Sequence, residues 1–357
     1  MKKTRVGIIF GSRSVEHEVS VITAYQVIEA IDKEKYEPIP IYITKDGKWM
    51  LGPCNIEAFK KEIPNREIIF PPIPKAGLIK KGIFHKRIDI DIAFPLVHGT
   101  YGEDGTLQGL LELADIPYVG SGVLGSSLCM DKIASKKIFK SLSFPIVDWL
   151  CFERGEKGMI EDIEKNLSYP VIVKPSNLGS SIGVNTSSNK DELIFALDVC
   201  FEYSQKAIVE KALLESREIN CAILGDKEVI PSLLEEVMKG DKFLTYSEKY
   251  RKGKGMKGAG RIIPAEIDDE LTKKIQALSI EAFRACSLSG IARIDFLLKD
   301  GEIYINEINT IPGSLSFYLF KPMGIDFKEL ITRLIDIGFS EYKRKKEVKY
   351  SYELSIF

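Results

Sequence analysis

The chain has 357 residues, more than one hydrophobic core usually organises, so its length predicts two or three domains. Hydrophobic residues make up 45% and charged residues 28%, a composition typical of globular proteins that argues against a disordered chain. With 50 Lys and Arg against 51 Asp and Glu, the net charge of -1 indicates neither a nucleic-acid partner nor a membrane surface.

The opening sequence MKKTRVGIIF is basic, but its apolar run of about five residues is shorter than the roughly 7–15 of a secretory signal. No stretch approaches the roughly 20 apolar residues of a membrane span. The six cysteines are scattered without a Cys-x-x-Cys pair, which favours reduced, mostly buried thiols over disulfides or metal ligands. We therefore expect a cytoplasmic protein.

Strands and helices alternate in the first third of the chain. The predicted elements are strands at 5–10, 38–44 and 90–98 and helices at 21–31 and 107–114. Strand, loop and helix repeated in this order predict a mostly parallel α/β domain over residues 1–127.

Two polar loops, at residues 11–20 and 98–109, follow strands of this domain. Such loops lie at the carboxyl edge of a parallel sheet, where ligands usually bind. The candidates for holding a substrate's ammonium or carboxylate group are Glu16, His98, Glu103 and Asp104. For the last two acids the alternative is that they only complement the positive start of the next helix. His17 is predicted to be a solvated loop residue.

A central domain is predicted over residues 128–215. Its apolar strand at 169–175 delivers Lys174 to a loop with two glycines and three serines, SNLGSSIG. Small residues let backbone N–H groups close around phosphate oxygens, and a lysine supplies charge. The segment matches neither a Walker A loop nor a dinucleotide fingerprint. The alternative is a serine- and glycine-rich hairpin with a solvated lysine, and Lys132 could likewise be a surface residue of its helix.

A third domain is predicted over residues 216–341, followed by a charged tail at 342–357 that is exposed or partly disordered. The segment 236–264 has five glycines and eight Lys or Arg, which predicts a mobile basic loop that folds over phosphates. An exposed disordered loop is the alternative. The expected contact points near the start of this loop are Tyr246, Lys249 and Tyr250.

The strands on either side of the turn at 300–301 carry the strongest chemical signal. Side chains two apart share a face, so Arg293 and Asp295 project together, as do Glu307 and Asn309. Converging carboxylate and amide oxygens would suit Mg²⁺. A two-residue hairpin, however, would put Asp295 and Glu307 on opposite faces. The magnesium prediction therefore requires an odd-length loop or a bulge, and a solvent-facing strand pair is the alternative.

Five motifs together resemble the D-alanine–D-alanine ligase family of the ATP-grasp superfamily: GSRSVEHEVS, HGTYGEDGTLQGLLE, GSGVLGSSLCMDK, VKPSNLGSSIG and RIDF…NEINTIPG. The resemblance covers nearly the whole chain. It implies an α/β and α+β, three-domain ATP-grasp architecture with an N-terminal parallel-sheet domain, and ATP bound between the other two domains. It also implies a homodimer that uses ATP with Mg²⁺ or Mn²⁺ to join two D-alanines through an acyl phosphate for peptidoglycan precursor synthesis.

The resemblance further implies roles for single residues. Lys132 and Lys174 would contact the ATP phosphates, Ser181 would belong to the loop that covers them, and Lys249 would reach the γ-phosphate. Adenine would be held by Glu210 and by the backbone near Ala212 and Leu213, and the ribose by Glu218. The magnesium ligands would be Asp295, Glu307 and Asn309. Catalytic roles are implied for Glu16, Ser180, Tyr250 and Arg293. Substrate contacts are implied for His98, Gly313, Ser314 and Ser316.

Departures from the family pattern leave the acceptor open. Tyr318 stands near the serine expected to receive the acceptor's carboxylate, and Ser314 or Ser316 would have to substitute for it. Tyr250 favours an amine acceptor over D-lactate. The remaining alternatives are D-serine or D-lactate as acceptor, and a nucleotide-binding protein without turnover.

Overall fold

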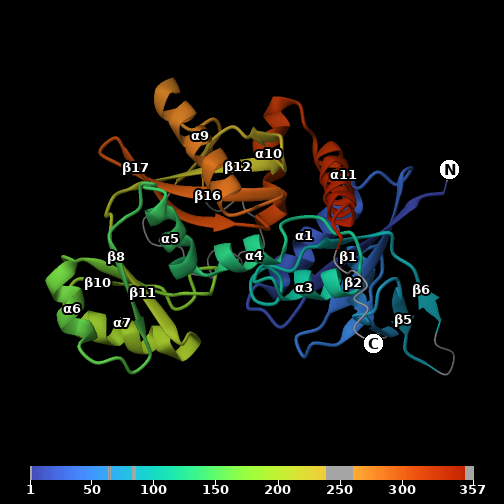
Figure 1. Cartoon of the computed structure of the whole chain (residues 1–357), viewed down its shortest axis with the longest axis horizontal. Helices are drawn as coiled ribbons and strands as arrows, with labels where there is room; N and C mark the ends of the chain where they lie inside the picture. The colour runs from blue at the N-terminus through green and yellow to red at the C-terminus, as the bar shows by residue number, and fades with distance from the viewer. Residues whose placement is uncertain (1, 63, 65, 83–85, 239–259, 350–357) are drawn as a thin grey trace, which may run out of the picture.

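The computed structural model describes residues 2–62, 64, 66–82, 86–238 and 260–349. In this part of the chain, the strands form three sheets that follow one another along the sequence (Figure 1). The sheets occupy residues 4–95, 149–211 and 217–309. They follow the order of the three predicted domains, whose boundaries remain predictions.

Three parallel strands form the centre of the N-terminal sheet. β1 (Thr4–Gly11) pairs in parallel with β2 (Tyr36–Ile43) and β7 (Ile92–Pro95), which confirms the predicted parallel sheet. Residues 6–11 of β1 are all buried, which explains why their sequence is a continuous apolar run. The helices that follow strands here are α1 (His17–Ala30) and α3 (Thr106–Leu113).

Beyond β2 the sheet continues in antiparallel pairs that sequence analysis did not predict. These short strands are β3 (Trp49–Leu51), β4 (Arg66–Ile69), β5 (Leu78–Lys80) and β6 (Arg87–Ile88), with α2 (Ile56–Lys61) between β3 and β4. They have two to four residues each, too few for an alternating pattern to be recognised.

The central sheet is antiparallel, in the order β10-β9-β11-β8. Its strands are β8 (Trp149–Glu153), β9 (Val171–Pro175), β10 (Asn185–Ser187) and β11 (Lys206–Lys211). One face packs apolar residues such as Val173 and Val209 into the core shared with α6 (Met159–Asn166) and α7 (Lys190–Tyr203). Because side chains alternate along a strand, Lys174 and Glu210 lie on the other face. The preceding helices are α4 (Val123–Met130) and α5 (Lys132–Ser141).

The C-terminal sheet has the order β15-β14-β12-β16-β17, with β13 paired to β12. Its strands are β12 (Arg217–Gly225), β13 (Val229–Pro231), β14 (Glu235–Val237), β15 (Arg261–Ile262), β16 (Gly290–Lys299) and β17 (Glu302–Asn309). Ile219, Ile294 and Phe296 pack from one face into a core with Phe283 of α9 (Asp269–Ala285). The opposite face carries polar side chains near Asp295, whereas Leu224 and Ile291 at one end of the strands are apolar.

The long C-terminal helix α11 (Phe327–Lys346) lies between the N-terminal and C-terminal sheets (Figure 1). Its fully buried Leu330 and Leu334 share one core with Val27 of α1 and with Leu224 and Ile291 of the C-terminal sheet. The chain reaches α11 through three short helical turns at Gly313–Ser316, Phe317–Phe320 and Lys321–Met323. This shared core fixes the two outer sheets relative to each other.

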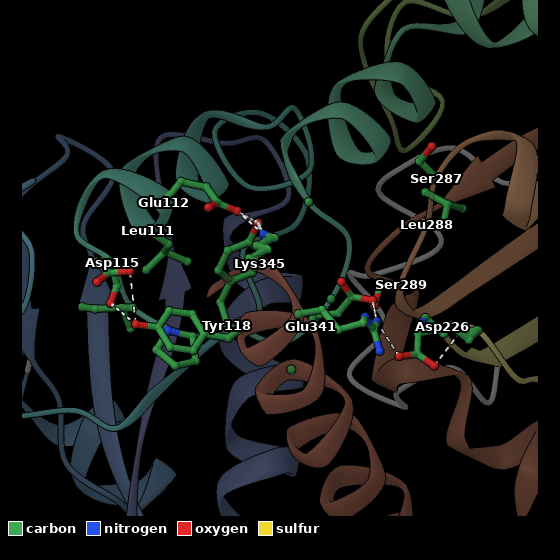
Figure 2. Close-up of a pocket in the computed structure, with 18 residues that line it drawn as sticks. Leu111, Glu112, Asp115, Tyr118, Asp226, Ser287, Leu288, Ser289, Glu341 and Lys345 are labelled. Atoms are coloured by element: carbon green, nitrogen blue, oxygen red, sulfur yellow. Dashed lines mark hydrogen bonds and ion pairs between the residues drawn. The ribbon is translucent and has the colours of Figure 1, made fainter. Parts of the chain in front are cut away.

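The first residues of the predicted charged tail belong to α11, which continues to Lys346. The Arg344 guanidinium lies 2.7 Å from Asp226 Oδ2, and the Tyr342 hydroxyl donates to Asp115 Oδ1 at 3.1 Å. Asp115, Asp226 and the pair of Lys345 and Glu112 lie around a cavity of about 380 Å³ between α3, α11 and the C-terminal sheet (Figure 2). None of the predicted site residues lines this cavity.

All six cysteines are free thiols, four of them buried, as predicted. Within the described residues, no helix combines the length and the apolar character needed to cross a membrane.

Candidate active site

A β-bulge in β17 brings the predicted metal ligands onto one face. The turn residues Asp300 and Gly301 both have positive φ, and the regular pairing that starts there extends to Phe296 opposite Ile305. The next pair is Asp295 opposite Glu307, so Asn306 is the extra residue. Directly opposed residues share a face. The bulge that the magnesium prediction required is therefore present.

The bulge completes a row of polar side chains across four strands. Glu235 of β14 lies opposite Asn220 of β12, which lies opposite Asp295, which in turn lies opposite Glu307. The Asn220 amide is 3.2 Å from Asp295 Oδ1 and, with its nitrogen toward the carboxylate, donates a hydrogen bond. In the next row Arg293 lies opposite Asn309. The polar face of the sheet thus gathers acids, amides and an arginine.

Asp295 is the centre of this patch. Arg293 donates to both of its oxygens, from Nε at 2.6 Å and from a terminal nitrogen at 2.7 Å, and Asn309 Nδ2 donates to Oδ2 at 2.9 Å. Burial and the neighbouring Glu307 raise the pKa of Asp295, against the opposing effect of Arg293. A buried carboxylate held this way requires a positive partner, which the guanidinium provides in this structure.

The donor set suits a hard cation shared with phosphate. No cluster of three or more His, Cys, Asp or Glu that could hold a metal by itself occurs among the residues described. Asp295, Glu307 and Asn309 instead offer two carboxylates and an amide on one face. Mg²⁺ is commonly held by one or two carboxylates and completes its shell with water and substrate phosphates.

Two lysines of the central region point toward this patch. Lys132 Nζ lies 3.6 Å from Glu307 Oε2 and donates to the Leu178 carbonyl at 2.7 Å. Lys174 Nζ donates to Asn306 Oδ1 at 3.2 Å and to Glu210 Oε2 at 2.7 Å. The bulge residue therefore links the two sheets, and the lysines lie where an anion between the sheets would meet them.

A third lysine, Lys136, was missed by sequence analysis. Its side chain is 1% exposed, and its Nζ lies 3.1 Å from Glu210 Oε1. Burial lowers the pKa of Lys136. Burial alone would raise the pKa of Glu210, but Lys174 and Lys136 together lower it to about 2. Glu210 is thus an ionised carboxylate held between two ammonium groups.

The loop at residues 176–183 meets the N-terminal domain. Ser180 donates its hydroxyl proton to Glu16 Oε1, and Ser180 and Ser181 both have positive φ, at 55° and 59°. Non-glycine residues in this region are strained, and such residues cluster at functional sites. A Cβ added at Gly99 would lie 2.6 Å from Glu16 Oε2, so the glycine leaves room for this carboxylate.

His98 and Glu103 lie together beneath this contact. His98 is buried and within 3.1 Å of the Thr23 hydroxyl, and burial lowers its pKa to about 4. Glu103 accepts from the Gly99 and Ile311 N–H groups, each at 2.8 Å. Burial and the nearby Glu16 raise the pKa of Glu103 to about 7. Glu103 therefore ties the N-terminal loop to the end of the C-terminal sheet.

Two other loop residues have structural roles. Asp104 accepts from the N–H groups of Tyr101 at 2.7 Å and Thr106 at 3.0 Å, which matches the alternative of a helix-start residue. His17, predicted to be solvated, is buried, with Nδ1 2.7 Å from the Ser12 carbonyl and Nε2 3.1 Å from the Tyr42 hydroxyl. Its position after β1 suggested a loop, but α1 begins at His17.

Comparison with known proteins agrees with this geometry. The family descriptions "D-ala D-ala ligase N-terminus" and "D-ala D-ala ligase C-terminus" match residues 5–121 and 138–336. A D-alanine–D-alanine ligase from Thermosipho africanus is 43% identical over 360 residues, covering 99% of this chain and 98% of the relative. The chain belongs to the D-alanine–D-alanine ligase family.

Two solved structures of this family extend the comparison. A D-Ala:D-Ser ligase from Enterococcus faecalis is 34% identical, with a TM-score of 0.83 over 94% of this chain and 100% of that chain. A D-alanine–D-alanine ligase from Bacillus anthracis, solved with ATP, is 29% identical, with a TM-score of 0.72 over 96% and 99%. As a member of the D-alanine–D-alanine ligase family the chain is an enzyme, and its three-domain ATP-grasp fold is confirmed.

The adenine segment predicted from the family lies at the end of β11. Ala212 already donates its N–H to the Pro170 carbonyl at 3.0 Å, so the other backbone groups of Ala212 and Leu213 would have to serve adenine. Glu218, on β12, shares the polar face with Asn220 and adds a negative charge near Asp295. Its predicted contact with ribose remains a prediction.

The loop after β17 contains the residues that the family pattern suggested for binding the acceptor. Ser314, Leu315 and Ser316 form a left-handed turn with φ near 50°. Ser316 is fully buried, and its hydroxyl has no hydrogen-bond partner among the described residues, so its predicted contact with the acceptor remains a prediction. Ser314 is also buried, at 5% exposed, and Gly313 begins the turn.

Tyr318 instead belongs to a charged group near Arg293. Its hydroxyl donates to Glu235 Oε2 at 3.0 Å, and the Arg261 guanidinium lies 4.5 Å from its ring centre and 3.2 Å from Glu235 Oε1. Tyr246, Lys249 and Tyr250, the predicted contact points of the basic loop, lie outside the described residues. Sequence analysis missed Glu235 and Arg261 because it treated the segment 236–264 as one loop, with Glu235 just before it and Arg261 within it.

Proposed function

We propose that this protein uses ATP to join two molecules of D-alanine into D-alanyl-D-alanine for peptidoglycan precursors. The observation that carries the proposal is the polar patch around Asp295, which the bulge at Asn306 assembles opposite Lys132 and Lys174. Membership of the family and similarity to a Bacillus ligase solved with ATP support ATP as co-substrate.

The reaction proceeds in two displacements. A carboxylate oxygen of the first D-alanine attacks the γ-phosphorus of ATP, the bond to the β-phosphate oxygen breaks, and an acyl phosphate and ADP result. The amine of the second D-alanine then attacks the acyl carbon. The carbon–oxygen bond to phosphate breaks, the nitrogen loses a proton, and inorganic phosphate leaves.

Charge stabilisation is the main task of the side chains in the first step. Lys132 and Lys174 lie where they can bind the phosphates of ATP, and phosphoryl transfer depends mostly on positioning and electrostatics. Asp295, Glu307 and Asn309 would hold Mg²⁺, which neutralises phosphate charge when bound. Ser181 belongs to the loop that would cover these phosphates. Lys249 is expected to reach the γ-phosphate.

Substrate positioning falls to residues on the other side of the patch. Glu16, in its hydrogen bond with Ser180, can accept from the ammonium group of the first D-alanine, beside the neutral imidazole of His98. Arg293 and the Gly313 N–H would stabilise the oxyanion that forms when the amine attacks. Exclusion of water protects the acyl phosphate from hydrolysis, a role predicted for the segment that contains Tyr250.

A product assay tests the proposal. The purified protein is incubated with ATP, MgCl₂ and D-alanine, and the products are identified by mass spectrometry while phosphate release is followed. We expect ADP, phosphate and D-alanyl-D-alanine in equal amounts. Absence of D-alanine-dependent phosphate release would contradict the proposal, and absence of any phosphate release would support a nucleotide-binding protein without turnover.

The same assay identifies the acceptor. D-serine is included because the chain is similar to a D-Ala:D-Ser ligase, and D-lactate because an ester product has a different mass. We expect D-alanine to be preferred among the three. A cytoplasmic location, where ATP is available, and a homodimer are further predictions of this proposal.

A further inference from the structure

Lys136 is the most deeply buried cation of the candidate site. It follows Lys132 by one turn of α5, a helix that begins at the N-cap Asp131, whose carboxylate accepts from the Ile133 and Ala134 N–H groups. Lys132 reaches outward to Glu307, whereas Lys136 points inward to Glu210. The two lysines of one helix therefore serve different groups.

Glu210 binds a different lysine with each of its oxygens. Lys136 Nζ forms an ion pair with Oε1 at 3.1 Å without hydrogen-bond geometry, and Lys174 donates to Oε2 at 2.7 Å. The side chain of Glu210 is 3% exposed, so its charge depends on these partners. Removing one partner of a buried ion pair is strongly destabilising, because it leaves an uncompensated charge.

Lys136 and Lys174 differ in their exposure and in the other groups they contact. Lys174 is 12% exposed and also contacts Asn306, at the side where phosphates would bind. Lys136 is 1% exposed, and the charged groups facing it are Glu210, Lys174 and, farther away, Glu307. If Lys174 moved to an anionic ligand, Lys136 would still lie beside Glu210.

We propose that Lys136 is a positioning residue that keeps Glu210 ionised and fixed while Lys174 engages phosphate, and thereby sets the preference for a base with an exocyclic amine. The inference rests on the proposed function, in which Lys174 binds phosphates, and on the family resemblance, which implies that Glu210 holds adenine. An ionised carboxylate can only accept hydrogen bonds. It therefore favours the amine at position 6 of adenine over the carbonyl oxygen that hypoxanthine carries there.

The test compares ATP with ITP, whose base has a carbonyl oxygen in place of the 6-amino group and therefore a proton at N1; comparing variants with the wild type isolates the contribution of Lys136. Dissociation constants are measured by calorimetry without D-alanine for the wild type, Lys136→Met and Lys137→Met. Lys137 is exposed on the same helix and provides the matched control. We expect Lys136→Met to weaken ATP binding and to lower the preference for ATP over ITP about tenfold, the scale of one charge-assisted hydrogen bond. Lys137→Met should match the wild type.

A second variant, Lys136→Gln, keeps a hydrogen-bond donor without the charge and guards against misfolding of the methionine variant. We expect an intermediate preference for ATP, with thermal unfolding as the check on folding. An unchanged preference in the folded variants, or failure of both to fold, would reduce Lys136 to a structural residue and overturn the proposal.

The binding measurement is independent of catalysis. A wild-type protein that binds ATP but forms no dipeptide would contradict the proposed function and leave the role of Lys136 standing. A wild-type protein that binds ITP as tightly as ATP would contradict the roles of Glu210 and Lys136 and leave the ligase reaction standing.

Discussion

The polar patch on β16 and β17 and the lysine cluster around Glu210 solve the same problem in different ways. Both hold acids against cations. In the patch, Glu307 is 34% exposed and Lys132 lies 3.6 Å away. In the cluster, Glu210 is 3% exposed and is bound on both oxygens. In the patch, the Glu307 carboxylate is accessible to a ligand. In the cluster, the Glu210 carboxylate is buried and its charge is balanced by two lysines.

The difference indicates how an anionic ligand could bind Lys132 and Lys174 without leaving the carboxylates of Glu307 and Glu210 unpaired. Surface ion pairs contribute little and are exchanged easily, whereas buried pairs are costly to break. Lys132 and Lys174 can move to phosphate because their acids have other partners or solvent nearby. Glu210 can release Lys174 because Lys136 remains. The patch and the cluster should therefore respond differently to substitution, the patch in kcat and the cluster in nucleotide affinity.

The largest effect is expected for Asp295→Asn in the patch. The change removes a candidate metal ligand and half of the bidentate pair with Arg293. We expect kcat to fall about a thousandfold, the scale of losing a main electrostatic contact in a transition state. The measurement is D-alanine-dependent phosphate release. Asp300→Asn, at the exposed end of the same hairpin, is the control and should retain wild-type kcat.

A smaller effect is expected for Asn306→Ala, which removes the contact between patch and cluster. Lys174 loses the amide oxygen at 3.2 Å but keeps Glu210. We expect KM for ATP to rise about fivefold, the scale of one hydrogen bond to a charged group when water can replace it, with kcat unchanged. A large loss of kcat with unchanged KM would show that Asn306 serves the patch and not the lysine.

Sequence analysis could predict the patch because its residues are local in the chain. Asp295 and Glu307 lie on two strands joined by a two-residue turn, so alternation alone assigns their faces. The same alternation revealed a conflict, and the bulge at Asn306 resolves it. The position of the extra residue could not be predicted, because several residues of β17 could have been the bulge without changing the pattern.

The cluster was less predictable because its residues come from three separate elements. Lys136 and Glu210 are 74 residues apart, and only the packing of α5 against the central sheet brings them together. A signal did exist. Lys136 lies three residues after Ile133 and three before Phe139, so it falls on the buried face of α5. A lysine on an apolar face requires a buried acid, but the sequence does not name that acid.

The last prediction concerns stability and pH, and it tests the contact that holds the patch to the N-terminal domain. Glu103 ionises near pH 4.5 in an unfolded chain, but burial and Glu16 raise its pKa to about 7 in the folded protein. A carboxyl group with a raised pKa contributes stability that is present at low pH and is lost as pH rises through the folded value. Glu103→Gln is neutral at every pH and removes this dependence.

We therefore expect the free energy of unfolding of Glu103→Gln, relative to the wild type, to be more favourable at pH 8 than at pH 5. Denaturant unfolding at the two pH values measures the difference, and Asp104→Asn in the same loop is the control. His98, whose pKa is lowered to about 4, favours folding as pH rises in both proteins, so its effect cancels in the comparison. A difference between the proteins that does not change with pH would show that Glu103 is ionised in the folded state throughout. The loop contact would then be an ordinary charged one, held by the Gly99 and Ile311 N–H groups.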